Sequence, residues 1–153
     1  MTMDFMTAVK TCLTQKYATF SGRASRSEYW WFFLAAVIGA FVAALLGPLS
    51  MIYGLAMICP MLAAGYRRLQ DTGRPGWWIV IPATLNLIAS LLAPDMPDEA
   101  AMASGDLPGM GAIALSGILS LIGLVVALVF IWFLTRPSDP GPNQYGPPPT
   151  ASA

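Results

Sequence analysis

The chain has 153 residues, with eight Lys and Arg, eight Asp and Glu, and no His. Hydrophobic residues make up 56% of it, charged residues 10%, and the mean hydropathy is +0.63, which excludes an ordinary soluble domain and indicates a membrane protein. The zero net charge argues against nucleic-acid binding, and the lack of histidine removes the commonest general base and metal ligand. Two cysteines do not make a disulfide framework. We therefore expect free thiols, no metal and no cofactor.

The first 20 residues predict an amphipathic helix. Asp4 and Lys10 interrupt any apolar core, so this segment is not expected to be a cleavable signal peptide. Phe5, Val9 and Leu13 recur at helical spacing, which predicts a helix lying in the inner headgroup region of a membrane. A short soluble helix is the alternative.

Four membrane spans are predicted, at about residues 28–46, 49–66, 76–93 and 111–134. Residues 29–66 carry no charge and are too many for one helix across a hydrocarbon core of about 30 Å, so Gly47-Pro48 is expected to separate two spans. Pro60 and Pro82 are expected to kink the second and third spans. The predicted class is all-α and polytopic.

Charge gives the orientation. With four spans, all eight basic residues fall on one side, and basic residues in short loops stay cytoplasmic, so both termini are predicted to be cytoplasmic. The charged residues of the opposite loop, 94–110, are all acids: Asp95, Asp98, Glu99 and Asp106. Residues 1–136 are predicted to form a single membrane domain. Residues 137–153 are expected to be a Pro-rich cytoplasmic tail.

Small and polar residues inside the spans predict helix packing. Two stripes at helical spacing are predicted to serve packing within the bundle, with a homodimer seam as the alternative: Ala35, Gly39, Ala43 and Gly47 in the first span, and Ser116, Ser120, Gly123 and Ala127 in the fourth. Asn86 lies near the middle of the third span. It is predicted to bond a neighbouring helix, or else to line a polar path.

Two cytoplasmic stretches, residues 20–33 and 67–78, each place arginines and one carboxylate before a Trp-Trp pair. Their candidate site residues are Arg23, Arg26, Glu28, Trp30 and Trp31 in the first, and Arg67, Arg68, Asp71, Arg74, Trp77 and Trp78 in the second. Ser25 and Glu28 form a capping box, and Asp71-Thr72-Gly73 is a turn signal.

The charged residues of these stretches support two interpretations. In a structural clamp, Arg23 or Arg26 pairs with Asp71, and Arg68 or Arg74 pairs with Glu28. Alternatively, the surplus positive charge binds an anion such as a lipid phosphate, a nucleotide or an acidic segment of a partner.

These motifs resemble those of the DUF805 family of small bacterial inner-membrane proteins. Residues 20–31 resemble its aromatic-Ser-Gly-Arg-x-x-Arg-x-Glu-aromatic-Trp signature, and residues 67–78 resemble its Arg-Arg-x-x-Asp-x-Gly-x-x-Gly-Trp-Trp loop. Residues 141–147 are similar to its Gly-x-Asn-x-Tyr-Gly tail. The resemblance covers nearly the whole chain; it implies an inner-membrane location and supplies no activity.

The tail has three alternatives. Asn143 and Tyr145 fold back onto the arginine loops with the tyrosine stacked on a guanidinium, or they bind a partner, or the tail stays disordered.

The leading functional hypothesis is a non-enzymatic membrane module whose cytoplasmic Arg/Trp loops bind anionic lipid or a protein partner. The alternative is a small-solute transporter or channel, with Thr84, Asn86 and the serines of the fourth span lining the path. A membrane enzyme using Asp71 or Glu28 on a lipid-linked substrate is disfavoured, because the sequence offers no His, no metal-ligand cluster and no activated nucleophile.

Overall fold

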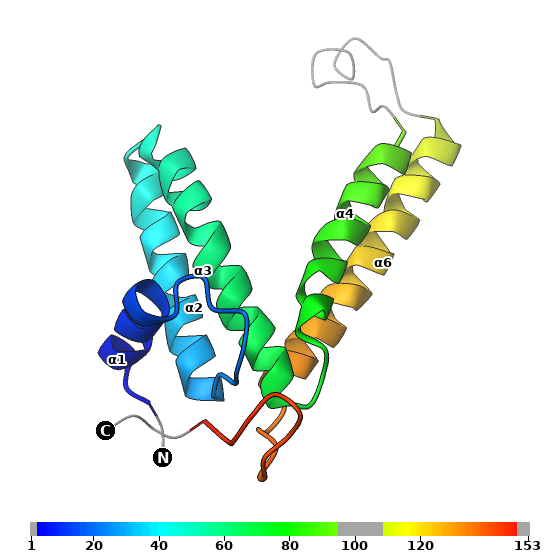
Figure 1. The fold of residues 1–153 in the computed structure, drawn as a ribbon. Coiled ribbons are helices and arrows are strands. Elements are labelled where there is room, and N and C mark those ends of the chain that lie inside the picture. The colour runs from blue at the N-terminus through cyan, green and yellow to red at the C-terminus, as the bar shows by residue number, and fades with distance from the viewer. Residues whose placement is uncertain (1–2, 95–108, 150–153) are drawn as a thin grey trace. The chain divides into compact units, whose positions relative to one another are not determined.

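The computed structural model describes residues 3–94 and 109–149. Within these ranges all regular elements are helices, as predicted, and an isolated β-bridge joins Asn143 to Gly146. In chain order they are α1 (Phe5–Lys10), the π-helical turn η1 (Thr11–Gln15), α2 (Arg26–Leu45), α3 (Leu49–Asp71), the 3-10 segment η2 (Gly76–Val80), α4 (Ile81–Leu92) and α6 (Met110–Thr135) (Figure 1). The four acids predicted for the opposite loop lie outside the described residues.

The chain divides into two compact units. The first comprises Met1–Ile79 and Phe133–Ala153, so it contains α1 to α3 and the last residues of α6. The second, Val80–Trp132, contains α4 and the rest of α6. Every candidate residue of the two arginine motifs lies in the first unit.

A tight hairpin joins α2 and α3 where the sequence predicts one (Figure 1). Gly47 has φ +66, a left-handed conformation that favours glycine and reverses the chain after α2. Gly39 allows the helices to approach closely, because the Tyr53 ring occupies the space that a Cβ atom would fill. The Tyr53 hydroxyl donates to the Ala36 carbonyl at 2.8 Å. The predicted role of Gly39 in packing within the protein is therefore confirmed.

Helix α3 continues beyond the predicted end at Tyr66 and reaches Asp71. Its end is a Schellman motif: the Gly73 N–H donates to the Gln70 carbonyl and the Arg74 N–H to the Leu69 carbonyl, each at 3.1 Å. Gly73 supplies the left-handed residue at φ +73. The prediction was wrong because hydropathy falls at Arg67, whereas arginine and glutamine remain good helix formers.

The third predicted span is built from two helical pieces, η2 and α4. Pro82 lies in the first turn of α4, so the expected kink inside a helix is wrong there. At that position the missing N–H would have no intrahelical acceptor anyway. Pro60, by contrast, lies inside α3 as expected.

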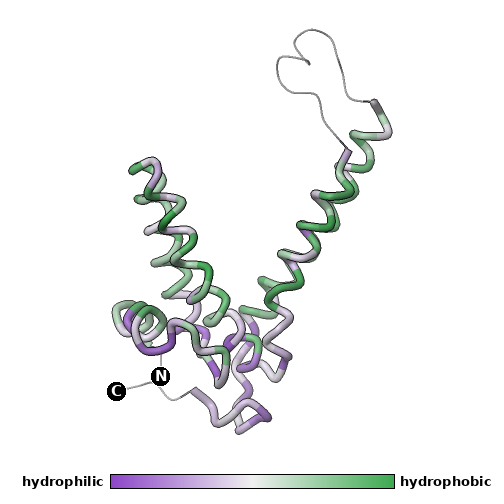
Figure 2. The backbone as a smooth tube through the Cα atoms, turned by 45° about the horizontal axis from the view of Figure 1, so that its top comes forward, coloured by the Kyte–Doolittle hydropathy of each residue, from purple (hydrophilic) through white to green (hydrophobic). Residues whose placement is uncertain are grey.

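Three helices of the described residues, α2, α3 and α6, are long and apolar enough to cross a membrane. The segment Gly76–Leu92 is apolar but shorter. Figure 2 shows the apolar colour running along α2 and α3, with polar residues gathered at the end of the first unit that holds the N-terminal segment. The long helices thus position a polar cluster at one end of the α2–α3 hairpin.

The N-terminal helix packs against α2. Asp4 caps it by accepting the Thr7 N–H at 3.0 Å. Its buried residues are Ala8, Thr11 and Cys12, whereas Met6 remains 71% exposed. The buried face thus differs from the Phe5, Val9 and Leu13 stripe used to predict the helix.

Candidate functional site

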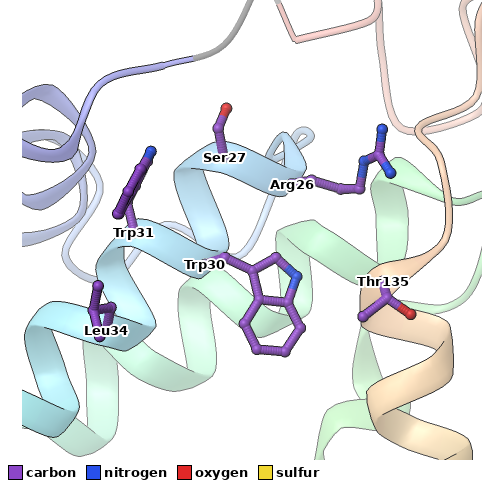
Figure 3. A pocket seen from close by; sticks show the side chains of 6 residues that line it. All are labelled: Arg26, Ser27, Trp30, Trp31, Leu34 and Thr135. Carbon is purple, nitrogen blue, oxygen red and sulfur yellow. The ribbon is translucent and has the colours of Figure 1, made fainter.

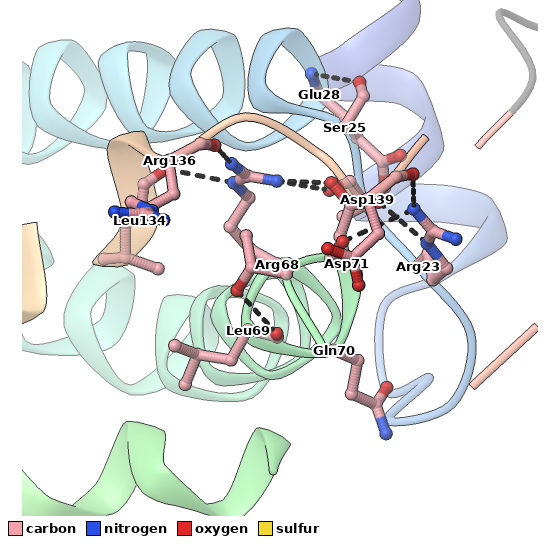
Figure 4. A network of polar contacts seen from close by, with 12 residues as sticks. Arg23, Ser25, Glu28, Arg68, Leu69, Gln70, Asp71, Leu134, Arg136 and Asp139 are labelled. Carbon is pink, nitrogen blue, oxygen red and sulfur yellow. Dashed lines mark hydrogen bonds and ion pairs between the residues drawn. The ribbon is translucent and has the colours of Figure 1, made fainter. Parts of the chain in front are cut away.

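The start of α2 is fixed by Ser25, whose hydroxyl accepts the Glu28 N–H at 3.1 Å (Figure 4). This half of the predicted capping box is confirmed. The Glu28 carboxylate has a different role, because it bonds to Arg67 and is only 1% exposed. Capping therefore sets the start of the helix, and the carboxylate points into the protein.

Asp71 is the centre of the polar cluster at the end of α3 (Figure 4). Its side chain is fully buried and pairs with two arginines: Arg23 Nε lies 2.9 Å from Oδ1, and Arg68 bonds Oδ2. The predicted Arg23–Asp71 pair is confirmed. The side chains of both arginines are also at least 99% buried, so this is an interior ion cluster. Removing one charge from such a cluster would leave its partner charged in a low-dielectric interior.

Glu28 pairs with Arg67, so the predicted pairing with Arg68 or Arg74 was wrong. The reason is the extra turn of α3: neighbouring residues on a helix point about 100° apart, which sends Arg67 and Arg68 toward different carboxylates. Cys12 completes this pair, with its Sγ 3.9 Å from Glu28 and 3.8 Å from Arg67.

The Cys12 thiol is shielded from water by this arrangement. Burial, reinforced by the nearby Glu28 carboxylate, raises the pKa of Cys12 to about 11, although the Arg67 charge opposes the shift. The thiol is therefore neutral at physiological pH and a poor nucleophile. Both Cys12 and Cys59 are free, as predicted.

Arg68 also binds the end of α6. It donates to the backbone carbonyls of Leu134, at 2.9 Å, and of Arg136. The last carbonyls of a helix lack intrahelical donors and carry partial negative charge, so a buried guanidinium both satisfies and stabilises them. Arg68 thereby ties three separated segments together: the end of α3, the chain after Arg23 through the Ala24 carbonyl at 3.4 Å, and the end of α6.

The tail folds back onto the same cluster. Arg23 donates to the carbonyls of Asp139 at 2.6 Å and Gly141 at 2.7 Å, and the Asp139 N–H donates to the Asp71 carbonyl at 3.0 Å. Asn143 donates to the Gln70 carbonyl at 2.9 Å. Of the three alternatives for the tail, residues 137–149 follow the one in which it returns to the arginines.

The predicted stacking of Tyr145 on a guanidinium is not the cation–π contact observed. The observed contact is between Arg74 and Phe133, with the guanidinium carbon 4.4 Å from the centre of the ring. Trp78 packs against the same ring, with a centroid distance of 5.9 Å. Its neighbour Trp77 is 57% exposed. The second Trp-Trp pair therefore has one packed and one outward-facing member.

Arg26 stands apart from the buried cluster. It is exposed and makes no ion pair with any described residue, although it was one of two candidates for pairing with Asp71. Figure 3 shows Arg26 and Trp30 extending from α2 toward Thr135 at the end of α6. They line an open cavity of about 600 Å³ together with Ser27, Trp31, Leu34 and Thr135. One guanidinium thus borders a largely aromatic and aliphatic surface.

Asn86 lies in the second unit and bonds within its own helix, not to a neighbouring one as predicted. Its amide nitrogen donates to the Pro82 carbonyl at 2.9 Å. The side chain nevertheless borders a cleft of about 540 Å³ between α4 and α6, which is lined also by Ser90, Ser116 and Ser120. The small-residue stripe of α6 therefore faces α4.

Sequence reasoning missed several members of the cluster. Cys12 was expected only to be a free thiol, and Asp139 and Gln70 were not considered. Their signal in the sequence is weak, because Asp139 stands in a Pro-rich stretch and its contacts with Arg23 and Asp71 are made by its backbone atoms. No group of three or more His, Cys, Asp or Glu residues within the described ranges is placed to hold a metal.

These features define a small helical membrane protein whose long helices end in a buried arginine–carboxylate cluster. The family described as "Protein of unknown function (DUF805)" matches residues 17–147, and the chain belongs to it. The matched region includes both arginine motifs and the docked tail. Thus the sequence resemblance is confirmed.

Two relatives are inner membrane proteins of Escherichia coli strain K12. Inner membrane protein YhaH is 29% identical over 147 residues, covering 88% of this chain and 90% of YhaH. Inner membrane protein YhaI is 44% identical over 75 residues, covering 44% of this chain and 64% of YhaI. No solved structure shows a significant match.

Proposed function

We propose that the protein is a non-enzymatic module of the bacterial inner membrane that binds the phosphate of an anionic lipid at the Arg26 cavity. The observation that carries this proposal is the exposed Arg26, which makes no ion pair with any described residue and lies beside Trp30 and Trp31. The guanidinium offers a bidentate contact to phosphate, and tryptophans favour the headgroup level of a bilayer. Leu34 extends the same wall with an apolar side chain that suits the first part of an acyl chain.

Membrane location and topology are part of the proposal. The inner-membrane relatives support the location, and the long apolar helices support a polytopic protein. For the third span, five 3-10 residues and twelve α-helical residues together rise about 28 Å, close to a hydrocarbon core of about 30 Å. Four spans then place all eight basic residues and both termini on the cytoplasmic side.

The N-terminal helix suits the same membrane face. Its outer side carries Met6, 71% exposed, and Leu13, 38% exposed, while its inner side packs on α2. Such a helix is expected to lie in the headgroup region, beside the proposed lipid site. Phe5 connects the two features, since its ring packs edge-on against Trp31 at 5.9 Å.

Native mass spectrometry of the protein extracted with its lipids tests the binding site. Arg26→Gln is the informative variant, because Arg26 is exposed and its replacement is not expected to disturb the fold. Arg23 and Arg68 are buried in ion pairs, so replacing either would destabilise the protein. Lys10→Gln is the matched control, since it removes an exposed cation from the same unit. We expect the parent and Lys10→Gln proteins to retain phosphatidylglycerol, and Arg26→Gln to lose it. The melting temperature of Arg26→Gln in lipid-free detergent is expected to equal that of the parent, which shows that the variant is folded.

Two outcomes would contradict the lipid proposal. Equal lipid retention by all three proteins would leave Arg26 without a binding role. Loss of a co-purifying protein, rather than of lipid, from Arg26→Gln would favour a protein partner.

A small-solute transporter remains the second candidate, because the α4–α6 cleft brings an amide and three hydroxyls together in an apolar unit. Polar groups at membrane depth are often part of a transport path. Substrate-dependent flux in reconstituted vesicles that is lost in Asn86→Leu would favour this candidate over lipid binding.

A further inference from the structure

A third cavity, of about 350 Å³, is lined by residues of the N-terminal segment and of the tail. Its volume is within the range of small-molecule sites. The N-terminal segment contributes Thr11, Gln15 and Lys16, and the tail contributes Tyr145 and Pro147–Pro149. Met3, Gly22, Arg23 and Glu28 complete the lining. The cavity is separate from the Arg26 cavity and shares no lining residue with it.

Thr11 is a largely buried polar residue on the wall of this cavity. Thr11 is only 5% exposed and lines the cavity, and its hydroxyl forms no hydrogen bond with any described residue. The hydroxyl of Thr14, three residues further along the chain, instead donates to the Lys10 carbonyl at 2.7 Å. A hydroxyl that borders a cavity is available to bond a ligand or a water that enters it.

A π-helical turn joins Thr11 to Lys16 on the cavity wall. Residues Thr11–Gln15 form a π-helical turn, and the Lys16 N–H donates to the Thr11 carbonyl at 2.8 Å. This bond fixes the backbone between Thr11 and Lys16, and Thr11, Gln15 and Lys16 all line the cavity. Single π-helical turns are rare and recur at functional sites.

The charge around the cavity is positive. Lys16 is half-buried and has no ion-pair partner within the described ranges. The Glu28 carboxylate is already bound by Arg67, and Asp71 is shared between two arginines. Four cations therefore face three carboxylates in and behind the wall: Lys16, Arg23, Arg67 and Arg68 against Glu28, Asp71 and Asp139.

We propose that this cavity binds a small anion that carries a phosphate-type oxyanion group. The Lys16 ammonium supplies the compensating charge, the Thr11 hydroxyl and the Gln15 amide supply hydrogen bonds, and Tyr145 with the prolines forms an apolar wall for the rest of the ligand. Because the wall belongs to the N-terminal and C-terminal segments, the occupied site joins the two ends of the chain.

The test uses the full chain in phosphatidylcholine nanodiscs. Inorganic phosphate is titrated at constant ionic strength, with chloride as the reference salt, and the melting temperature is followed by tryptophan fluorescence. Ligand binding to the folded state raises the melting temperature saturably. We expect such a rise for the parent, and a dissociation constant about tenfold higher for Lys16→Gln, as for loss of one charge-assisted bond.

Three controls sharpen the test. Thr11→Val, similar in shape, is expected to weaken binding several-fold, whereas Lys10→Gln and Arg26→Gln are expected to respond like the parent. A second series replaces free phosphate with phosphatidylglycerol in the nanodisc. A Lys16-dependent response only in that series supports the site and assigns the anion to a lipid headgroup.

The proposal is overturned if the parent shows no saturable rise in either series. It is equally overturned if Lys10→Gln weakens the response as much as Lys16→Gln, because the effect would then be one of net charge. Since Arg26→Gln tests the proposed lipid function independently, failure of one site is distinguishable from failure of the other.

Discussion

Asp71→Asn is expected to destabilise the protein strongly. The substitution keeps the shape of the side chain but removes the one carboxylate that pairs with Arg23 and Arg68, all three side chains being at least 99% buried. Breaking a buried ion pair by removing one partner costs about 3–5 kcal/mol. We expect a loss within that range, since both guanidiniums keep backbone carbonyl partners that soften the penalty.

The assay is reversible unfolding in mixed detergent micelles, followed by tryptophan fluorescence. A loss of this size is a large part of the roughly 5–15 kcal/mol that stabilises a typical folded protein. Arg26→Gln, at an exposed position, is the matched control and is expected to change stability by less than about 0.5 kcal/mol. If Asp71→Asn lowered the free energy of unfolding by less than about 1 kcal/mol, or by no more than the control, the buried ion cluster would not be holding these segments together.

Two further predictions concern the tail and the buried thiol. Asn143→Ala removes side-chain hydrogen bonds to the Gln70 carbonyl, at 2.9 Å, and to the Asp139 carboxylate, at 3.1 Å. The loss is expected to lower the free energy of unfolding by about 1–2 kcal/mol and to increase the hydrogen exchange of residues 137–149. Unchanged protection of these residues would contradict the prediction. Cys12, with a pKa of about 11, is expected to react with iodoacetamide far more slowly at pH 8 than a solvent-exposed cysteine with an ordinary pKa. The reaction is expected to become faster as the pH rises toward 11, because the raised pKa keeps the thiolate scarce below that value. Rapid labelling of Cys12 in the folded protein at pH 8, measured by peptide mass spectrometry, would refute its placement.

The sequence alone determined the helices and the location of the chemistry. Long uncharged runs and the Gly47-Pro48 break were sufficient to place α2, α3 and α6 within a few residues, because membrane-length helices depend mainly on local hydropathy. The two arginine motifs marked the polar cluster for the same reason: they are the places where the apolar runs end. Ser25 as the cap of α2 followed from local hydrogen bonding.

Only the tertiary structure decided which charges meet. Because α3 continues to Asp71, Arg67 turns toward Glu28 and Arg68 toward Asp71, so the partner of Glu28 differs from the predicted one. The tail was equally beyond local reasoning, since Arg23 holds it through the carbonyls of Asp139 and Gly141, atoms that every residue carries. Hydropathy and capping act over a few residues, whereas the Glu28–Arg67 pair, the Arg23–Asp71 pair and the docking of the tail join segments at least 39 residues apart in the chain.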